Sequence, residues 1–318
     1  MLNWENEPLR ALVEEASRLS RKNFPMRLTV SAPSQKHYDT GIYQNQRKSF
    51  MTMSVTGSHC ALMCDHCGTQ VLETMAVANS PSRFQMVADG LVESGAEGVL
   101  ISGGCLDDGS VPLERFVADI AGMKSQGLTV LVHTGLVKRH VARALKEAGV
   151  DQILLDIIGD DETIRQVYHL NKTTEAYRES LAILREEGLK AVPHVIAGLH
   201  FGRLRGEFHA LEMIRDEGCA QLVIVALMPL PGTKMAAVPA ISAKDVGRVL
   251  ASARLMMPST PMSLGCAKPV GDQKKGMEFY AVDVGVQNIA YPLPETIRYA
   301  EAQGYEICYH EKCCSLPA

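Results

Sequence analysis

The chain has 318 residues and a net charge of −4 at pH 7, with 46% hydrophobic and 21% charged residues. This composition excludes a globally disordered chain and lacks the basic excess of nucleic-acid-binding proteins. No run of about 18 apolar residues exists that would cross a membrane. The first 22 residues are polar and amphipathic, unlike a signal peptide. We therefore expect a cytoplasmic protein that binds neither nucleic acid nor a membrane.

From about residue 49 onward, short apolar runs alternate with amphipathic helical runs. Strands are predicted at residues 49–55, 98–104, 128–135, 151–159, 190–198, 220–229, 261–266 and 286–292. Helices are predicted at residues 82–95, 112–127, 137–149, 175–188 and 206–218. Continuously apolar strands separated by helices are typical of parallel strands covered on both faces. Eight such units without a linker predict an α/β fold, a (βα)8 TIM-type barrel, with an open doubly wound sheet as the alternative.

Around this barrel the sequence predicts three parts. They are an N-terminal helical extension over residues 1–48, the barrel over 49–303 and a cysteine-rich tail over 304–318. A barrel carries its chemistry at the C-terminal ends of its strands. Polar and sulfur-bearing side chains gather at those predicted ends, namely Cys60, Cys105, His133, Asp156, His194, His200, Cys266 and Tyr291.

Three of the nine cysteines fall within eight positions, in the stretch GSHCALMCDHCG at residues 57–68. Because disulfides are rare in a reducing cytosol, metal binding or catalysis explains them better. Thiolates favour zinc or iron–sulfur clusters, and structural zinc generally takes four ligands. Cys60, Cys64 and Cys67 offer three, while His59 and His66 directly flank a cysteine and would strain a shared zinc site. A cubane cluster on three cysteines would leave one iron open to a reactant.

The stretch CALMCDHC after the first strand of a predicted βα barrel resembles the signature loop of the radical S-adenosylmethionine (SAM) superfamily. The resemblance implies that Cys60, Cys64 and Cys67 hold a [4Fe–4S] cluster. It further implies that the fourth iron binds the amino and carboxylate groups of SAM, from which a 5′-deoxyadenosyl radical is released. An aromatic residue often precedes the last cysteine in this family, and His66 stands there instead.

The same resemblance assigns further cofactor contacts. Ser102, Gly103 and Gly104 match the Gly-Gly motif whose backbone receives the amino group of SAM, although Cys105 stands where many members have Glu. Asp156 is expected either to bind the ribose diol or to support the following helix start. Gly198, His200 and Arg203 are expected near the cofactor carboxylate or the substrate, with a solvated loop as the alternative. His133 and His194 are either core histidines or catalytic groups.

The chain ends in AEAQGYEICYHEKCCSLPA, with three cysteines in its last eleven residues. Unligated cysteines on a terminus would be prone to oxidation. We expect a second cluster on Cys308, Cys313 and Cys314, with Cys266, Cys105 or Ser315 as the fourth ligand. The ten residues from 304 to 313 can extend roughly 33 Å, enough to return over the barrel. A tail of unligated thiols is the alternative.

A second cluster is typical of the sulfur-inserting radical SAM enzymes, biotin synthase and lipoyl synthase. The stretches SVTGSHCALMCDHC, LISGGC, SLGCAKP and the terminal CC resemble the two-protein lipoyl synthases of archaea and some bacteria. This resemblance implies an octanoyl-lysine carrier protein as substrate, a second radical SAM subunit as partner and a reductant such as ferredoxin. Single-chain lipoyl synthases carry their extra cysteines before the radical loop, and this chain has none there.

Three alternatives to sulfur insertion are kept open. One is a biotin-synthase-like radical enzyme that rearranges a carbon skeleton or matures a hydrogenase cofactor. Another is a non-enzymatic iron–sulfur protein that carries electrons or clusters and does not cleave SAM. The last is a structural zinc module, which would be colourless.

Overall fold

The structure, a computed structural model, describes residues 7–46 and 48–316, and residues 1–6 of the predicted extension lie outside the described residues. All eight predicted strands are present. They are β2 (Phe50–Ser54), β4 (Gly98–Ser102), β5 (Thr129–His133), β6 (Gln152–Asp156), β7 (Ala191–Ala197), β8 (Leu222–Ala226), β9 (Met262–Leu264) and β10 (Asn288–Ala290). Three further strands are β1 (Arg27–Ser31), β3 (Ala76–Val77) and β11 (Glu306–His310).

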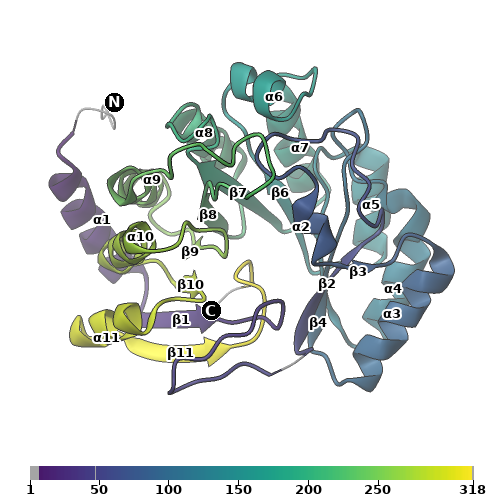
Figure 1. Ribbon diagram of the computed structural model, residues 1–318, viewed down its shortest axis with the longest axis horizontal. Coiled ribbons are helices and arrows are strands. Elements are labelled where there is room, and N and C mark those ends of the chain that lie inside the picture. Colours follow the sequence, from purple (N-terminus) through teal and green to yellow (C-terminus); the bar gives the residue numbers. More distant parts are fainter. Residues whose placement is uncertain (1–6, 47, 317–318) are drawn as a thin grey trace.

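These strands form one curled parallel sheet in the order β11-β1-β10-β9-β8-β7-β6-β5-β4-β2-β3 (Figure 1). The predicted strands therefore neighbour one another in chain order, which confirms the α/β class and excludes a doubly wound order. In the described residues, no hydrogen-bonded ladder joins the β11 edge to the β2–β3 edge. The curled sheet is a half-barrel, because β1 and β11 extend its far edge instead of pairing with β2.

Helices connect the strands, and most of them cover the outer face of this sheet (Figure 1). They are α1 (Leu9–Asn23), α2 (Gln70–Glu73), α3 (Pro81–Glu93), α4 (Val117–Ser125), α5 (Arg139–Glu147), α6 (Asp161–Val167), α7 (Thr174–Glu186), α8 (Glu207–Glu217), α9 (Ala243–Met256), α10 (Asp272–Val284) and α11 (Pro294–Ala302). The five predicted helices correspond to α3, α4, α5, α7 and α8. None of the helices in the described ranges is long and apolar enough to span a bilayer.

Successive side chains of each strand alternate between the outer face and the inner face of the curled sheet. Val130, Ile153 and Leu222 pack in one buried cluster with helix residues such as Phe84 and Leu145. The neighbouring positions belong to a second cluster that lines the inside of the curl, with members Leu131, Leu154, Val192 and Val223. Because side chains alternate with a period of two, His133, Asp156 and His194 share the inner face. The fold thus directs these three polar side chains into the interior.

Strand β1 lies within residues 1–48, where the sequence pattern predicts only a helical extension. β1 has Leu28 and Val30 as buried apolar positions, and it pairs with β10 on one side and β11 on the other. Five residues between polar segments carry too little periodic signal to be recognised as a strand. Strand β11 lies in the predicted cysteine-rich tail, and pairing with β1 carries that tail back to the sheet.

Candidate metal centre

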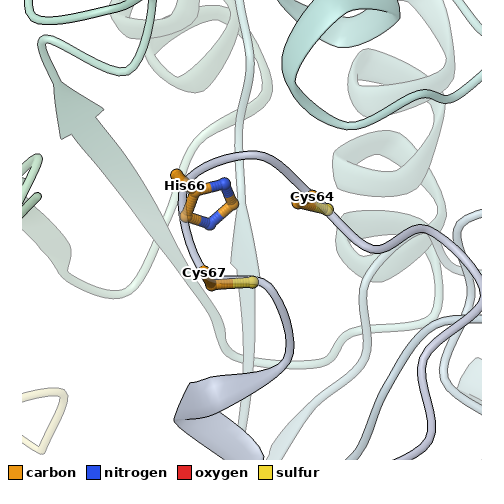
Figure 2. A group of neighbouring side chains, drawn as sticks. All are labelled: Cys64, His66 and Cys67. Carbon is orange, nitrogen blue, oxygen red and sulfur yellow. The ribbon is translucent and has the colours of Figure 1, made fainter. Parts of the chain in front are cut away.

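The three motif cysteines lie on the loop between β2 and α2, at the C-terminal end of β2. The backbone N–H groups of Cys67 and Gly68 donate to the carbonyl of Cys64 at 3.2 and 2.9 Å, which turns the loop back on itself. Gly68 has φ +48°, a left-handed value suited to glycine. The ligand atoms of Cys64, His66 and Cys67 all lie within 4.8 Å of one another (Figure 2). Cys64 is buried, and Cys60 is half-buried.

Cys60 is held by the glycine turn that follows β4. The N–H of Cys105 donates to Sγ of Cys60 at 3.3 Å, and the N–H of Gly104 donates to Oγ1 of Thr56 at 2.7 Å. A Cβ on Gly104 would lie 1.9 Å from the carbonyl oxygen of His59 and 2.5 Å from Cβ of Cys60. Only glycine permits this approach of the two loops. The glycine turn therefore fixes the position of the first cysteine.

A hydrogen bond between two thiols lowers the pKa of the thiol that accepts it and raises the pKa of the thiol that donates it. The thiol of Cys105 lowers the pKa of Cys60 to about 6, although burial opposes this effect. The thiol of Cys64 and, more weakly, the imidazole of His66 lower the pKa of Cys67 to about 4. The pKa values of Cys64 and Cys105 rise because each thiol donates to its neighbour and is buried. The loop therefore has two sites that favour thiolates, the form in which cysteine binds metal.

Asp65, inside the motif, braces the loop and was not singled out from the sequence. Its carboxylate lies 2.7 Å from Nε2 of His169 and 2.8 Å from Nζ of Lys234. Its N–H donates to the carbonyl of Val167 at 2.9 Å, and its own carbonyl accepts from Met235 at 3.3 Å. Asp65 thus joins the cysteine loop to two loops that follow α6 and β8. Its position inside the stretch CDHC is the one sequence signal that pointed to Asp65.

Ser102 and Gly103 lie at the end of β4, beside the cysteine loop. Oγ of Ser102 donates to the carbonyl of His133 at 3.4 Å. A Cβ on Gly103 would lie 3.1 Å from both Oγ1 of Thr56 and Cγ2 of Val55. The space near these glycines is filled by the cysteine loop, and the Gly104 N–H already has a partner. Their contact with SAM stays a prediction.

Asp156 lies at the inner end of β6, where a polar group of side chains has formed. It accepts from the hydroxyl of Tyr168 at 3.3 Å and lies 3.6 Å from Nε2 of His133. Burial would raise the pKa of Asp156, but His133 and further histidines outweigh it and lower the pKa to about 2. Burial lowers the pKa of His194 to about 4, so this imidazole is neutral near pH 7. An ionised carboxylate and a neutral imidazole therefore line the interior.

The sequence predicts Gly198, His200 and Arg203 near the cofactor. In the structure they lie after β7, and each has different neighbours. The N–H of Gly198 donates to the buried carboxylate of Glu207 at 2.8 Å, and Gly198 has φ +79°. Nδ1 of His200 lies 3.0 Å from Oγ1 of Thr163 on α6, and Arg203 is exposed. Glycine is required at 198 by the left-handed turn. In the structure these residues shape the loop after β7, and their contacts with a cofactor stay predictions.

The end of the chain enters the interior of the sheet. The carbonyl of Cys314 accepts from Nε2 of Gln221 at 2.8 Å and from Oγ of Ser263 at 2.8 Å. Oγ of Ser315 lies 3.4 Å from Nε2 of His194. Cys314 and Ser315 are both buried. The predicted return of the tail is thus present, and it places two residues of the tail inside the curl.

The remaining cysteines lie in several places. Cys105 lies at Cys60, as described, rather than at the tail. Cys313 packs in the inner cluster with Tyr291, and Cys266 perturbs the pKa of Cys314 and of Tyr291. Cys308 is part of β11, where it pairs with Thr29. The structure thus brings Cys313 and Cys314 together in the inner cluster, and the ligand set of a second metal cluster stays a prediction.

Comparison with known proteins identifies the first thiol group. Residues 54–202, just under half of the chain, match the family model described as Radical SAM superfamily. This part of the chain is similar to a radical SAM domain. The match begins at the end of β2 and includes Cys60, Cys64, Cys67 and the glycine turn. This family uses a [4Fe–4S] cluster and SAM.

Curated relatives are biotin synthases. The synthase of Thioalkalivibrio sulfidiphilus is 28% identical over 185 residues, covering 56% of this chain and 52% of that protein. The synthase of Acidithiobacillus ferrooxidans is 23% identical and covers 72% and 74% of the two chains, and biotin synthase 2 of Paracoccus denitrificans is 24% identical and covers 77% of each. The chain is therefore similar to the biotin-synthase-like branch of this superfamily. In the first of these alignments the chain spans about half the length of its relative.

Solved structures share the fold. A maturase of the [FeFe]-hydrogenase aligns with a TM-score of 0.68 at 15% identity, covering 96% of this chain and 71% of that one. Methylornithine synthase aligns with a TM-score of 0.63 at 15% identity, covering 94% and 89%. At these identities the likeness concerns the half-barrel alone.

The residues of the loop fit an iron–sulfur cluster. Nδ1 of His66 is buried without a hydrogen-bond partner in the described residues, beside the thiols of Cys64 and Cys67. Two of the three motif thiols have lowered pKa values, and a metal would deprotonate the third. The donor set is sulfur-rich, which favours iron–sulfur chemistry. The residues of the cysteine loop are thus consistent with the cofactor of the radical SAM family.

Proposed function

We propose that this protein is a radical SAM enzyme whose Cys60, Cys64 and Cys67 hold the [4Fe–4S] cluster. The observation that carries the proposal is the contact between two motifs, in which the N–H of Cys105 meets Sγ of Cys60 at 3.3 Å at the C-terminal edge of the parallel sheet. When bound, the cluster and SAM supply a carbon-centred radical that removes hydrogen from an unactivated C–H bond.

The chain's own residues would orient the cofactor and exclude water. Ser102, Gly103 and Gly104 are proposed to border the amino group of SAM. Asp156, ionised and aimed inward, is a suitable acceptor for a ribose diol. Gly198, His200 and Arg203 are proposed to lie on the opposite side of the cofactor. The inner wall of Leu131, Leu154 and Val192 keeps the site apolar, which protects a radical from side reactions.

Cleavage of SAM under anaerobic conditions tests this proposal. After reconstitution with iron and sulfide, and with dithionite as reductant, the protein is expected to convert SAM to methionine and 5′-deoxyadenosine. The Cys60→Ala, Cys64→Ala and Cys67→Ala variants should each lose this conversion. Cys219→Ser is the matched control, because Cys219 precedes β8 away from both thiol groups. A protein that binds iron but leaves SAM intact would instead be an electron or cluster carrier.

We further propose sulfur insertion, with the protein as one component of a two-protein lipoyl synthase. Two observations support this finer proposal. The tail carries Cys313 and Cys314 into the interior of the half-barrel, and the curated relatives are biotin synthases. The sulfur atom would come from an auxiliary iron–sulfur cluster, for which Cys308, Cys313 and Cys314 are the proposed ligands. The substrate would be an octanoyl-lysine carrier protein. A second radical SAM subunit would form the other C–S bond, and ferredoxin would supply electrons.

An octanoylated carrier domain provides the test of sulfur insertion. Mass spectrometry after anaerobic turnover should detect one C–H bond replaced by C–SH in the presence of this protein alone, and the dithiol when the partner subunit is added. Replacing Cys313 and Cys314 by Ser should abolish the sulfur product but preserve SAM cleavage. If the doubly substituted enzyme still turns over its natural substrate, the protein is a radical enzyme without sulfur insertion, such as a skeleton-rearranging or cofactor-maturing enzyme.

A further inference from the structure

His66 lies inside the cysteine motif, and its imidazole is a neighbour of two motif thiols. A ring nitrogen of His66 and the Sγ atoms of Cys64 and Cys67 all lie within 4.8 Å of one another (Figure 2). The side chain is half-buried, and its Nδ1 is buried. The imidazole therefore borders the place where the cluster is expected, although it is not one of the three cysteines proposed to hold it.

The loop that follows α6 restrains the ring of His66. The ring centroid lies 5.2 Å from that of Tyr168, with an angle of 36° between the two planes. Tyr168 is buried, and its hydroxyl donates to Asp156 on β6 at 3.3 Å. Asp65, the residue before His66, lies 2.7 Å from His169, the residue after Tyr168. Two consecutive motif residues thus pack on two consecutive loop residues, which keeps the imidazole beside the thiols.

The position of the imidazole proton follows from its neighbours. A cysteine that binds iron is a thiolate, which accepts hydrogen bonds and has no proton to donate. A neutral imidazole carries one N–H, and Nδ1 of His66 has no hydrogen-bond partner among the described residues. No acceptor elsewhere at this atom therefore fixes the tautomer. The thiolate decides it, and the nitrogen that faces the thiolate carries the proton.

We propose that His66 donates a hydrogen bond to the Cys67 thiolate and thereby raises the reduction potential of the cluster that Cys67 holds. This inference rests on the proposed function, because it requires a [4Fe–4S] cluster on the three motif cysteines. Reduction adds one negative charge to such a cluster. Hydrogen bonds to its sulfur atoms stabilise the added charge and are among the factors that set its potential. His66 is thus a positioning residue that acts through Cys67.

The two ends of the motif receive donors of different kinds. Sγ of Cys60 accepts from the backbone N–H of Cys105 at 3.3 Å, and any residue except proline at position 105 would supply this donor. The donor at Cys67 is a side chain, so it depends on the residue type at position 66. The imidazole contributes to the lowered pKa of Cys67, after the larger effect of the Cys64 thiol. Position 66 can therefore set the potential without a change of ligand.

A redox titration of the reconstituted full chain without SAM tests this inference. The reduced cluster is followed by electron paramagnetic resonance, and its signal is assigned to the motif by its loss in Cys64→Ala. His66→Phe keeps a ring but has no N–H, and it should lower the equilibrium constant for one-electron reduction about tenfold, a shift of about 59 mV to lower potential. His66→Gln retains an N–H donor and should stay near the wild-type potential.

His59→Phe is the matched control for this titration. His59 also adjoins a motif cysteine, but its side chain is exposed, so the same substitution there should leave the potential unchanged. Equal potentials for wild type and His66→Phe would overturn the inference. An equal shift in His66→Phe and His66→Gln would also overturn it, because packing rather than the donor would then be responsible.

Labelling with ¹⁵N-histidine gives a second answer if His66→Phe does not bind iron. A weak ¹⁵N hyperfine coupling to the reduced cluster that is lost in His66→Gln supports the hydrogen bond. The absence of coupling in the wild type overturns it, as does the strong coupling of an iron-bound nitrogen. A wild-type chain without iron at the motif would overturn the proposed function as well. A cluster with an unchanged potential would overturn this inference alone.

Discussion

The backbone N–H of Cys105 donates to Sγ of Cys60 at 3.3 Å, so the turn after β4 ends on a thiol of the loop after β2. β2 and β4 pair in parallel from Phe50↔Gly98 to Ser54↔Ser102, which brings the two turns out at the same edge. The cysteine loop after β2 is thus positioned by the neighbouring strand β4. The contact makes the glycine turn part of the metal centre.

Gly104→Ala should disrupt this contact. Its Cβ would lie 1.9 Å from the carbonyl oxygen of His59, a backbone atom that cannot rotate away. Overpacking of this kind costs about 1–3 kcal/mol, and here the strain falls on the loop that carries Cys60. We expect the variant to lose the cluster of the motif, measured as iron per chain. Gly90→Ala in α3 is the control, since its added Cβ meets nothing within 4 Å and should leave the iron content unchanged.

Asp65→Asn should loosen the cysteine loop. The buried carboxylate binds His169 and Lys234, and an amide would weaken both charged contacts by about 1–3 kcal/mol. We expect faster loss of iron from the motif cluster in the presence of a chelator, followed by absorbance. Lys234→Ala should have the smaller effect, because the lysine side chain is 69% exposed and solvent screens its charge. Equal rates for wild type and Asp65→Asn would show that the brace is unimportant.

Gln221→Leu should affect the tail without affecting the motif. The substitution removes one of two donors to the Cys314 carbonyl, within a buried network, at a cost of about 1–3 kcal/mol. We expect lower occupancy of the auxiliary cluster proposed at Cys313 and Cys314, and an unchanged electron paramagnetic resonance signal from the reduced motif cluster. Loss of both signals together would mean that the network supports the whole fold.

Acid should weaken the loop that follows the glycine turn. Burial would raise the pKa of Asp108, but Lys138 and Ser110 outweigh it and lower the pKa to about 2. A lowered folded-state pKa stabilises the fold above the ordinary value near pH 4, and this contribution is lost as the pH falls from about 4 to 2. Because the carboxylate is 39% exposed, we expect only roughly 0.2–1 kcal/mol. Thermal unfolding of wild type and Asp108→Asn should therefore differ at about pH 6 and converge near pH 2.

Local sequence signals determined the eight parallel strands, the three motif cysteines and the glycine pair of this protein. The eight parallel strands were recognisable because each is a continuous apolar run, and a strand buried on both faces requires one. Cys60, Cys64 and Cys67 were recognisable because their spacing on one short loop is a local property, as is the glycine pair at residues 103 and 104.

Only the tertiary structure decided the features that depend on pairing between segments far apart in the sequence. β1 and β11 gain their stability from each other and from β10, and five-residue segments show no such partnership in their own residues. The same pairing leaves the barrel open and places Cys308 three strands from Ser263. It also brings the tail to Gln221 and Ser263. Asp65 likewise became a brace only where the loops of His169 and Lys234 meet it. Side chains are brought together across hundreds of residues by strand register, a property of the folded sheet that no local stretch of sequence contains.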